Sequence, residues 1–168
     1  LSVLGREDGV ERWLAALERH GEDGALVEQL PGTDLLVCVG GDGTVLQASG
    51  SALHTKTPVF GVRLGRLGFL AEATEDEAED KLRQLLAGEG RIERRALVQA
   101  QAGDEAPLHA LNDVVIGRQR LGRTVSVGVR VDGVLLAEYR TDAVVVATAT
   151  GSTGYALAVN GPILHPTS

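Results

Sequence analysis

Residues 35–44 of the chain are LLVCVGGDGT, and this stretch decides the fold of the first half of the molecule. Its apolar part, 35–39, has the length of a buried strand, and the helix-forming run VLQA follows the glycines at 45–48. The pattern predicts a strand, a tight turn and the start of a helix. Glycines let a backbone approach a phosphate closely, and the free amides at a helix N-terminus favour negative charge. Residues 40–44 are therefore a candidate anion site.

Asp42 is unexpected in a loop of this kind, because its carboxylate would repel a bare phosphate. Three roles would explain its presence. It could cap the helix, hold a metal ion, or accept a proton from a substrate hydroxyl. The residues themselves leave these three roles open.

The segments around this loop predict a parallel α/β domain. A helix from about 44 to 53 is followed by an apolar strand at 59–62, and such a unit implies parallel strands with a right-handed crossover. Ligands of these sheets bind beyond the carboxyl ends of the strands, where Asp42 lies. We expect further elements in this domain: a short strand at 1–4, an amphipathic helix at 9–20, a second glycine-bearing loop at 65–70 and a helix at 75–87.

The second half of the chain predicts a different, mainly antiparallel architecture. Asp132-Gly133 is a strong two-residue hairpin signal between two valine-rich segments. We place a domain boundary after residue 88, with a Rossmann-like parallel α/β domain over 1–88 and a β-rich, sandwich-like domain over 89–168. The chain starts at Leu1 and contains no Met, so it is not an intact translation product as written. Because it stops directly after a motif-rich segment, we expect natural sequence to be missing on the C-terminal side. The expected strands of this half are 97–102, 109–117, 125–131, 134–139 and 143–147.

Composition excludes several classes of function. The 168 residues are 43% hydrophobic and 23% charged, as in soluble globular proteins, and no apolar run reaches membrane-spanning length. A net charge of -7 argues against a nucleic-acid surface, which would need clustered Lys and Arg. The single cysteine, Cys38, cannot form an internal disulfide, so we expect a cytoplasmic setting.

Common catalytic motifs are absent from the sequence. It contains no P-loop, and Gly41-Asp42-Gly43 lacks the third glycine of the dinucleotide fingerprint. Ser152 does not lie in a G-x-S-x-G elbow, because Thr150 stands two residues before it. One cysteine and four scattered histidines have no zinc-binding spacing.

Two further groups of residues could carry chemistry. The strand at 143–147 opens into a turn rich in hydroxyls and glycines, 148–155, which predicts a second strand-to-helix anion site. The polar pair Asn112-Asp113 interrupts an apolar strand. Each has a structural alternative, since Ser and Thr cap ordinary helices and a polar pair often caps a turn. Together with residues 40–44, however, they suggest a nucleotide site.

These motifs resemble the NAD kinase family, whose members use ATP or polyphosphate to phosphorylate the adenosine ribose 2'-hydroxyl of NAD. The resemblance covers the chain from about residue 35 to its end. The GGDGT loop alone is less specific, because lipid kinases of the diacylglycerol and sphingosine type share it. The most distinctive segment is TGSTGY at 150–155, followed by NGPI at 160–163.

The resemblance implies a role for each matching position. Asp42 would be the catalytic residue, which accepts or orients the proton of the ribose hydroxyl. Asn112 and Asp113 would hold the adenine and ribose side of NAD, and Asp142 the nicotinamide end. The full set implied for NAD is Asp42, Gly43, Phe69, Asn112, Asp113, Asp142, Thr150, Thr153, Gly154 and Tyr155, and the set for the donor phosphates is Gly40, Gly41, Gly43, Thr44 and Arg63.

The resemblance also implies cofactors and partners. Mg²⁺ or another divalent cation would accompany ATP or polyphosphate as donor. The enzyme would be a homodimer or homotetramer in the cytoplasm, with no nucleic-acid or membrane partner. Two alternatives remain: a lipid or diacylglycerol-type kinase with the same GGDGT loop, and a nucleotide-binding relative without catalysis.

Three positions depart from the family's usual residues. Arg63 stands where Asn is usual, Asp113 where Glu is usual and Ala149 where Pro is usual. Asp113 keeps the charge with a reach shorter by one methylene. Arg63 adds a cation near the expected donor phosphates, and Ala149 loosens a turn that proline would stiffen.

Overall fold

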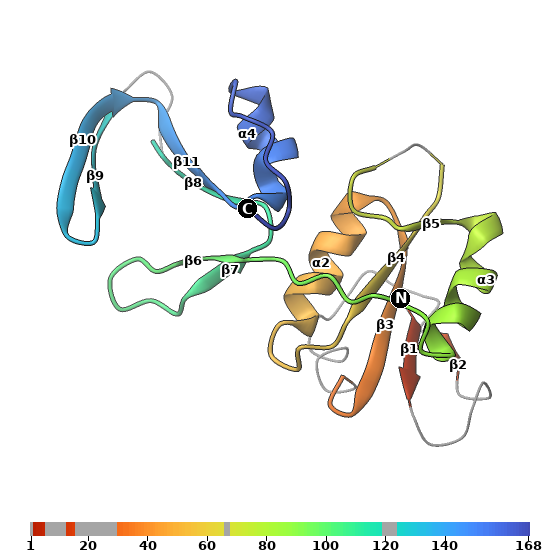
Figure 1. Cartoon of the computed structure of the whole chain (residues 1–168). Coiled ribbons are helices and arrows are strands. Elements are labelled where there is room, and N and C mark those ends of the chain that lie inside the picture. Colours follow the sequence, from red (N-terminus) through yellow and green to blue (C-terminus); the bar gives the residue numbers. More distant parts are fainter. Residues whose placement is uncertain (1, 6–12, 16–29, 66–67, 119–123) are drawn as a thin grey trace. The chain divides into compact units, whose positions relative to one another are not determined.

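The computed structural model describes the chain except for residues 1, 6–12, 16–29, 66–67 and 119–123. Two units make up the chain, Leu1–Arg94 and Arg95–Ser168 (Figure 1). Sequence composition placed the boundary after residue 88, and residues 89–97 lie in neither helix nor strand. The two units are described separately below.

The first unit is built on a five-stranded sheet of order β2-β1-β3-β4-β5. Strand β3 (Thr33–Gly40) pairs in parallel with β4 (Val59–Arg63), which pairs in parallel with β5 (Ala73–Thr74). Helix α2 (Asp42–Ala52) connects β3 to β4. The strand, helix, strand unit predicted from LLVCVGGDGT and its neighbours is therefore confirmed, with a helix that starts two residues earlier than expected.

The other edge of this sheet is antiparallel. Strand β1 (Ser2–Gly5) pairs antiparallel with β3 and with β2 (Trp13–Ala15). The predicted first strand is confirmed, but the predicted helix at 9–20 is wrong at Trp13–Ala15, and its other residues, 9–12 and 16–20, lie outside the described part. The apolar stripe in that segment favoured a helix, whereas backbone pairing with β1, which joins Leu4 to Trp13, decides the structure. A pairing with another segment overrides a local preference of this size.

Two apolar clusters pack against opposite faces of the sheet, as side-chain alternation along β3 requires. Leu36 and Cys38 pack with residues of α2 on one face, and Val37 packs in a cluster with Leu82 of helix α3 (Glu75–Leu86) on the other (Figure 1). The first cluster comprises Leu30, Leu36, Cys38, Val45, Ala48 and Ala52, and the second Val37, Phe60, Val62, Ala73 and Leu82.

Helix α3 (Glu75–Leu86) agrees with the predicted helix at 75–87. It begins with a capping box, in which the Thr74 hydroxyl accepts from the Glu77 backbone N–H and the Glu77 carboxylate accepts from the Thr74 backbone N–H. Three acidic residues fill its first turn, as the helix dipole favours.

The second unit consists of antiparallel strand pairs, as predicted. The pairs are β6 (Val98–Ala100) with β7 (Leu108–Ala110), β8 (Asp113–Gly117) with β11 (Ala143–Ala147), and β9 (Val125–Val131) with β10 (Val134–Thr141). The predicted hairpin turn is confirmed, because Asp132 and Gly133 both have positive φ angles, 50° and 81°. The described strands of this unit form three separate two-stranded sheets.

The predicted strand at 109–117 is divided in the structure. It breaks at Leu111 and Asn112, between β7 and β8. The carbonyls of these two residues accept hydrogen bonds from Thr148 instead of from a neighbouring strand. Among the helices that the structure describes, none has the length and apolar character to cross a membrane.

Candidate functional site

The first strand-to-helix corner is formed as predicted from its glycines. Gly40 ends β3, Gly41 is the N-cap of α2 and Asp42 is the first residue of the helix. A Cβ at Gly40 would collide with the Thr44 side chain, whereas Cβ atoms at Gly41 and Gly43 would meet nothing within 4 Å. The corner therefore has no room for a side chain at Gly40. At Gly41 and Gly43 the backbone is open, so a ligand can approach it.

The carboxylate of Asp42 does not cap the helix. The N-cap of α2 is Gly41, without a side-chain hydrogen bond. Instead, Asp42 Oδ2 accepts from the Phe69 backbone N–H at 2.9 Å, and Oδ1 accepts from the Leu70 backbone N–H at 3.1 Å. Of the three roles that the sequence left open for Asp42, helix capping is excluded.

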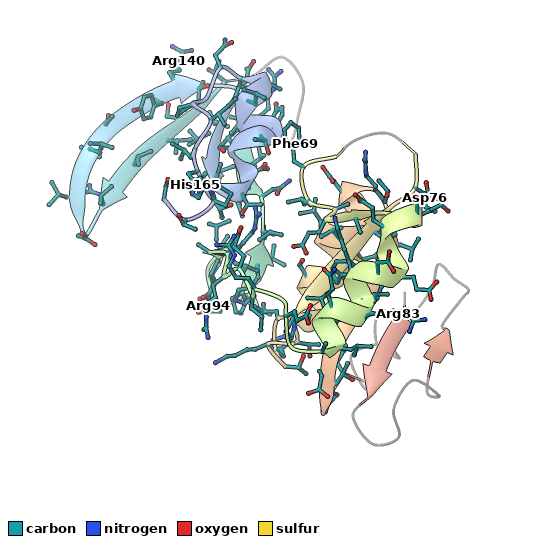
Figure 2. All side chains as sticks on the ribbon, turned by 45° about the vertical axis from the view of Figure 1, so that its right-hand side comes forward. Phe69, Asp76, Arg83, Arg94, Arg140 and His165 are labelled. Carbon is teal, nitrogen blue, oxygen red and sulfur yellow. The ribbon has the colours of Figure 1, made fainter. Side chains whose placement is uncertain are left out.

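The β4–β5 loop brings Phe69 beside this corner. Its backbone contacts Asp42, while its side chain is 70% exposed and projects from the loop (Figure 2). Arg63, at the end of β4, pairs in register with Gly40, and the Leu64 N–H donates to the Gly40 carbonyl at 3.3 Å. The structure thus brings Asp42, Phe69 and Arg63 to one edge of the sheet.

The second corner also has the predicted order of strand, turn and helix. After β11 come a 3-10 turn, η2 (Thr150–Thr153), and a short helix, α4 (Tyr155–Ala158). Thr148 connects this corner, by hydrogen bonds, to Leu111 and Asn112, the two residues between strands β7 and β8. Its hydroxyl lies 2.5 Å from the Leu111 carbonyl oxygen, and its backbone N–H donates to the Asn112 carbonyl at 2.9 Å.

Gly151 allows the corner to approach Asn112 closely. A Cβ at Gly151 would collide with the Asn112 carbonyl, so no larger residue fits without a shift of backbone. The Gly151 N–H donates to the Thr148 hydroxyl at 3.0 Å. The glycine-rich turn and the Asn112-Asp113 pair, distant in sequence, form one structural group.

Asn112 and Asp113 point their polar atoms at Gly154. A Cβ at Gly154 would lie 3.2 Å from Asn112 Nδ2 and 3.6 Å from Asp113 Oδ2. Within the described part of the chain, Asn112 Oδ1 is buried and has no hydrogen-bond partner. Since buried acceptors are normally satisfied, this oxygen is suited to accept a hydrogen bond from a ligand.

Two residues that sequence reasoning missed support this corner. Arg95 Nη1 donates to the Thr150 hydroxyl at 3.3 Å, and Arg95 lies far outside the motif. Ser152 is almost fully buried, donates to the Ala149 carbonyl at 2.6 Å and accepts from the Leu164 N–H at 3.0 Å. The glycine-rich motif contains Ser152, but its pattern does not show that the hydroxyl faces inward.

Two predicted site residues also lie in this corner. The Thr153 hydroxyl donates to the Thr150 carbonyl, and Tyr155 is half exposed.

Asp142 lies apart from this group. It precedes β11, whereas Thr148 follows it, so the two residues are about 20 Å apart at 3.3 Å per strand residue. Asp142 Oδ1 forms an ion pair with Arg118 Nη1 at 2.9 Å, and sequence reasoning did not identify Arg118. The structure therefore does not bring Asp142 together with Asn112 and Gly154.

Other chemistries find little support in the described residues. No group of three or more His, Cys, Asp or Glu side chains in the described ranges is placed to hold a metal ion. Burial raises the pKa of the Cys38 thiol from its ordinary 9.0 to about 11, so it stays protonated near neutral pH and is a poor nucleophile.

Two family models match the two halves of the chain. The family model of the ATP-NAD kinase N-terminal domain matches residues 8–90, and that of the ATP-NAD kinase C-terminal domain matches residues 111–168. An NAD kinase of Magnetococcus marinus is 42% identical over 139 residues, which are 80% of this chain and 46% of that protein.

Two solved structures share the fold. A yeast NADH kinase in complex with NADH superimposes with a TM-score of 0.75 at 30% identity, over 88% of this chain and 44% of that one. An NAD kinase from Archaeoglobus fulgidus in complex with ATP gives a TM-score of 0.69 at 32% identity, over 81% of this chain and 53% of that one. The chain spans about half the length of the curated relatives it matches.

Proposed function

Because the chain belongs to the NAD kinase family, we propose that the protein transfers a phosphoryl group from ATP or inorganic polyphosphate to the adenosine ribose 2'-hydroxyl of NAD, which yields NADP. The observation that carries this proposal is the Asp42 carboxylate, held in a fixed orientation at an open, glycine-lined helix N-terminus. A group that receives a proton and a corner that receives phosphates are both requirements of a kinase that acts on an alcohol.

The first corner would hold the donor side of the reaction. Helix N-termini have backbone N–H groups without intrahelical partners, and these donate to phosphate oxygens. The open approach at Gly41 and Gly43 supports this role, and Arg63 would add a positive charge at the same edge of the sheet. The donor-side residues in this proposal are Gly40, Gly41, Gly43, Thr44 and Arg63.

Asp42 would act on the ribose hydroxyl. An Asp is a weak base near neutral pH, but phosphoryl transfer with a loose transition state depends more on positioning than on base strength. A carboxylate offers about four lone-pair sites, and two accept backbone N–H bonds here, so others remain for a hydroxyl. Asp42 is therefore suited to orient the hydroxyl and to take its proton.

The second corner would bind NAD. The unpaired, buried Asn112 Oδ1 is an acceptor ready for the adenine amino group or a ribose hydroxyl, and Asp113 adds a carboxylate beside Gly154. Asp142 is retained at the nicotinamide end by family resemblance alone, because it lies at the far end of β11. The complete set proposed to contact NAD is Asp42, Gly43, Phe69, Asn112, Asp113, Asp142, Thr150, Thr153, Gly154 and Tyr155.

The metal and the assembly follow from the family. The described residues do not form a protein metal site, and both Asp42 oxygens already accept hydrogen bonds. We therefore propose that Mg²⁺ or another divalent cation arrives with the donor phosphates, which supply many of its ligands. We further propose a homodimer or homotetramer in the cytoplasm, which fits a single, buried, unpaired cysteine.

The test is a direct assay of the purified full-length protein. NAD or NADH is incubated with Mg²⁺ and either ATP or polyphosphate, and NADP or NADPH is quantified with a dehydrogenase that is specific for the phosphorylated cofactor. We expect product with at least one donor, and none after addition of excess EDTA. Absence of product with both donors and both acceptors would contradict the proposed function and favour a nucleotide-binding relative without catalysis.

A further inference from the structure

The loop between β4 and β5 forms a two-donor clamp on the proposed catalytic carboxylate. The clamp consists of the backbone N–H groups of Phe69 and Leu70, one on each oxygen of Asp42, at 2.9 and 3.1 Å. Two bonds to two oxygens fix the plane of the carboxylate, whereas one bond would leave it free to rotate. This interaction joins residues far apart in sequence at one edge of the sheet, where β3 and β4 both have their carboxyl ends.

The clamp is anchored to the core of the first unit. Leu70 packs against the apolar cluster that contains Leu36, Cys38 and Val45. Just beyond it, the Glu72 N–H donates to the Gly61 carbonyl at 2.9 Å. The two donor groups are therefore held by packing and backbone bonding rather than by the carboxylate alone, which makes them a preorganised support.

Gly68 is the residue that lets the clamp close. A Cβ at Gly68 would collide with Asp42 Oδ1 and would lie 2.7 Å from its Cγ. Any larger residue must displace either the carboxylate or the loop that carries the donors. The glycine is thus required by a close approach to Asp42.

We propose that Gly68, together with the backbone amides of Phe69 and Leu70, positions the Asp42 carboxylate for phosphoryl transfer. This inference rests on the proposed function, since it assigns Asp42 the role of orienting the substrate hydroxyl. Two lone-pair positions of the carboxylate are used by the clamp, and the remaining ones are available for the hydroxyl. Gly68 is a positioning residue, because it acts only through Asp42.

The kinetic test compares Gly68→Ala with the wild-type protein. We expect kcat to fall at least about tenfold, because a misplacement near 1 Å can cost about a hundredfold, while KM for NAD and for ATP stays within about twofold. Gly50→Ala is the matched control. It is the same substitution on the helix that carries Asp42, where a Cβ would meet nothing within 4 Å, and it should leave kcat unchanged.

A double-mutant cycle separates positioning from a general structural effect. In an Asp42→Ala background the Cβ at position 68 has no carboxylate to displace, so Gly68→Ala should cause no further loss of kcat. A merely structural role would lower kcat again in that background.

If Gly68→Ala fails to fold, a backbone ester provides a second test. Phenyllactic acid at position 69 replaces the Gly68–Phe69 peptide bond with an ester, which removes the Phe69 N–H donor and keeps the side chain. The same loss of kcat is expected.

A measurement without catalysis tests the clamp itself. Hydrogen exchange at the Phe69 and Leu70 amides should become several-fold faster in Asp42→Ala, and that at Val62 in β4 should not change. Unchanged exchange at both clamp amides would overturn the inference, as would a Gly68→Ala variant with wild-type kcat. If the wild-type protein makes no NADP while the exchange result holds, the proposed function fails but the clamp on Asp42 stands.

Discussion

The Asp42 carboxylate combines a fixed orientation with unused lone pairs, and this combination determines how a substitution should act. Asp42→Asn keeps the size of the side chain but replaces one acceptor oxygen with an NH₂ donor, which cannot face a backbone N–H and cannot take a proton. We expect kcat to fall at least roughly 10²-fold, in steady-state NADP formation. A rate within about twofold of wild type would contradict the proposed role of Asp42.

Gly151 is the residue on which the second corner depends. Gly151→Ala places a methyl group against the Asn112 carbonyl and should push Asn112 away from the turn. We expect the Kd for NAD to rise at least about tenfold, equivalent to about 1.4 kcal/mol of binding free energy, by calorimetry.

Gly128→Ala in β9 is the control for the Gly151 substitution. A Cβ at Gly128 would meet only Leu135 Cδ1, at an ordinary 3.7 Å. The Kd for NAD should therefore stay at the wild-type value in Gly128→Ala. Equal affinities of the Gly151 variant and the wild-type protein would show that the contact with Asn112 does not shape the NAD site.

The buried thiol of Cys38 should make the free energy of unfolding depend on pH. Burial raises the pKa of its thiol to about 11, above the 9.0 of the unfolded chain. Between these values the folded state keeps a proton that the unfolded state loses, so stability is complete below pH 9 and falls as pH rises, by up to about 1.4 kcal/mol per pH unit.

The measurement for Cys38 is urea unfolding from pH 7.5 to 10.5, followed by the fluorescence of Trp13, the single tryptophan. Cys38→Ala should be less stable than wild type at pH 7.5 and should lack the extra slope above pH 9, so the two stabilities should converge as pH rises. The same slope in both proteins would refute the assignment to Cys38, because the other titrating groups are shared.

At the scale of elements, α3 owes its start to the capping box. The Thr74 hydroxyl accepts a hydrogen bond from the Glu77 N–H. The pKa of the Glu77 carboxyl is lowered mainly by the hydrogen bond from the Thr74 backbone N–H and, to a smaller extent, by the Thr74 hydroxyl. We expect Thr74→Ala to reduce the free energy of unfolding of the first unit by about 1 kcal/mol, measured by Trp13 fluorescence in urea.

Thr74→Ser keeps a hydroxyl at the N-cap and is the matched control. It should be close to wild type in the free energy of unfolding. Because a lowered carboxyl pKa stabilises the folded state above the unfolded pKa, the contribution of Glu77 is lost as pH falls through its folded pKa. Thr74→Ala keeps the backbone N–H and removes only the part of this contribution that comes from the hydroxyl. The stability difference between Thr74→Ala and wild type should therefore shrink in acid by that part, and a difference independent of pH would contradict this reading of the cap.

At the scale of the whole molecule, burial is unequal between the two units. In the described residues, every buried apolar side chain of the core lies in the first unit, for example Leu36 and Phe60, whereas the second unit exposes large apolar side chains such as Leu136 and Val134. Burial of apolar surface is the main source of stability. The two units should therefore differ in their resistance to local unfolding.

This difference can be measured by native-state hydrogen exchange on the chain of residues 1–168. Backbone amides of β3 should exchange only through the highest-energy opening, and those of the β9–β10 hairpin should exchange much faster, at openings of lower free energy. Equal protection of Val37 and Val129 would show that the second unit is as stable as the first.

Several features followed from sequence patterns alone. The apolar run and glycines of 35–44 predicted β3, the turn and α2, and the Asp132-Gly133 dipeptide predicted the β9–β10 hairpin. The family assignment also came from local motifs. These predictions succeeded because each depends on interactions within a few residues, such as glycine geometry, side-chain alternation and helix capping.

Other features were decided only by the tertiary structure. The helical stripe at 9–20 gave way at Trp13–Ala15 to pairing with β1, and the break between β7 and β8 followed from the contact of Thr148 with Leu111 and Asn112. The roles of Gly68, Arg95 and Ser152 were invisible in the sequence because each contacts residues remote from it in the chain. Spacing and residue type determined which functional groups this protein carries. Packing between distant segments determined which of them meet. Asp42 contacts Phe69 and Leu70, and Asn112 contacts Gly151, whereas Asp142 pairs with Arg118 and joins neither group.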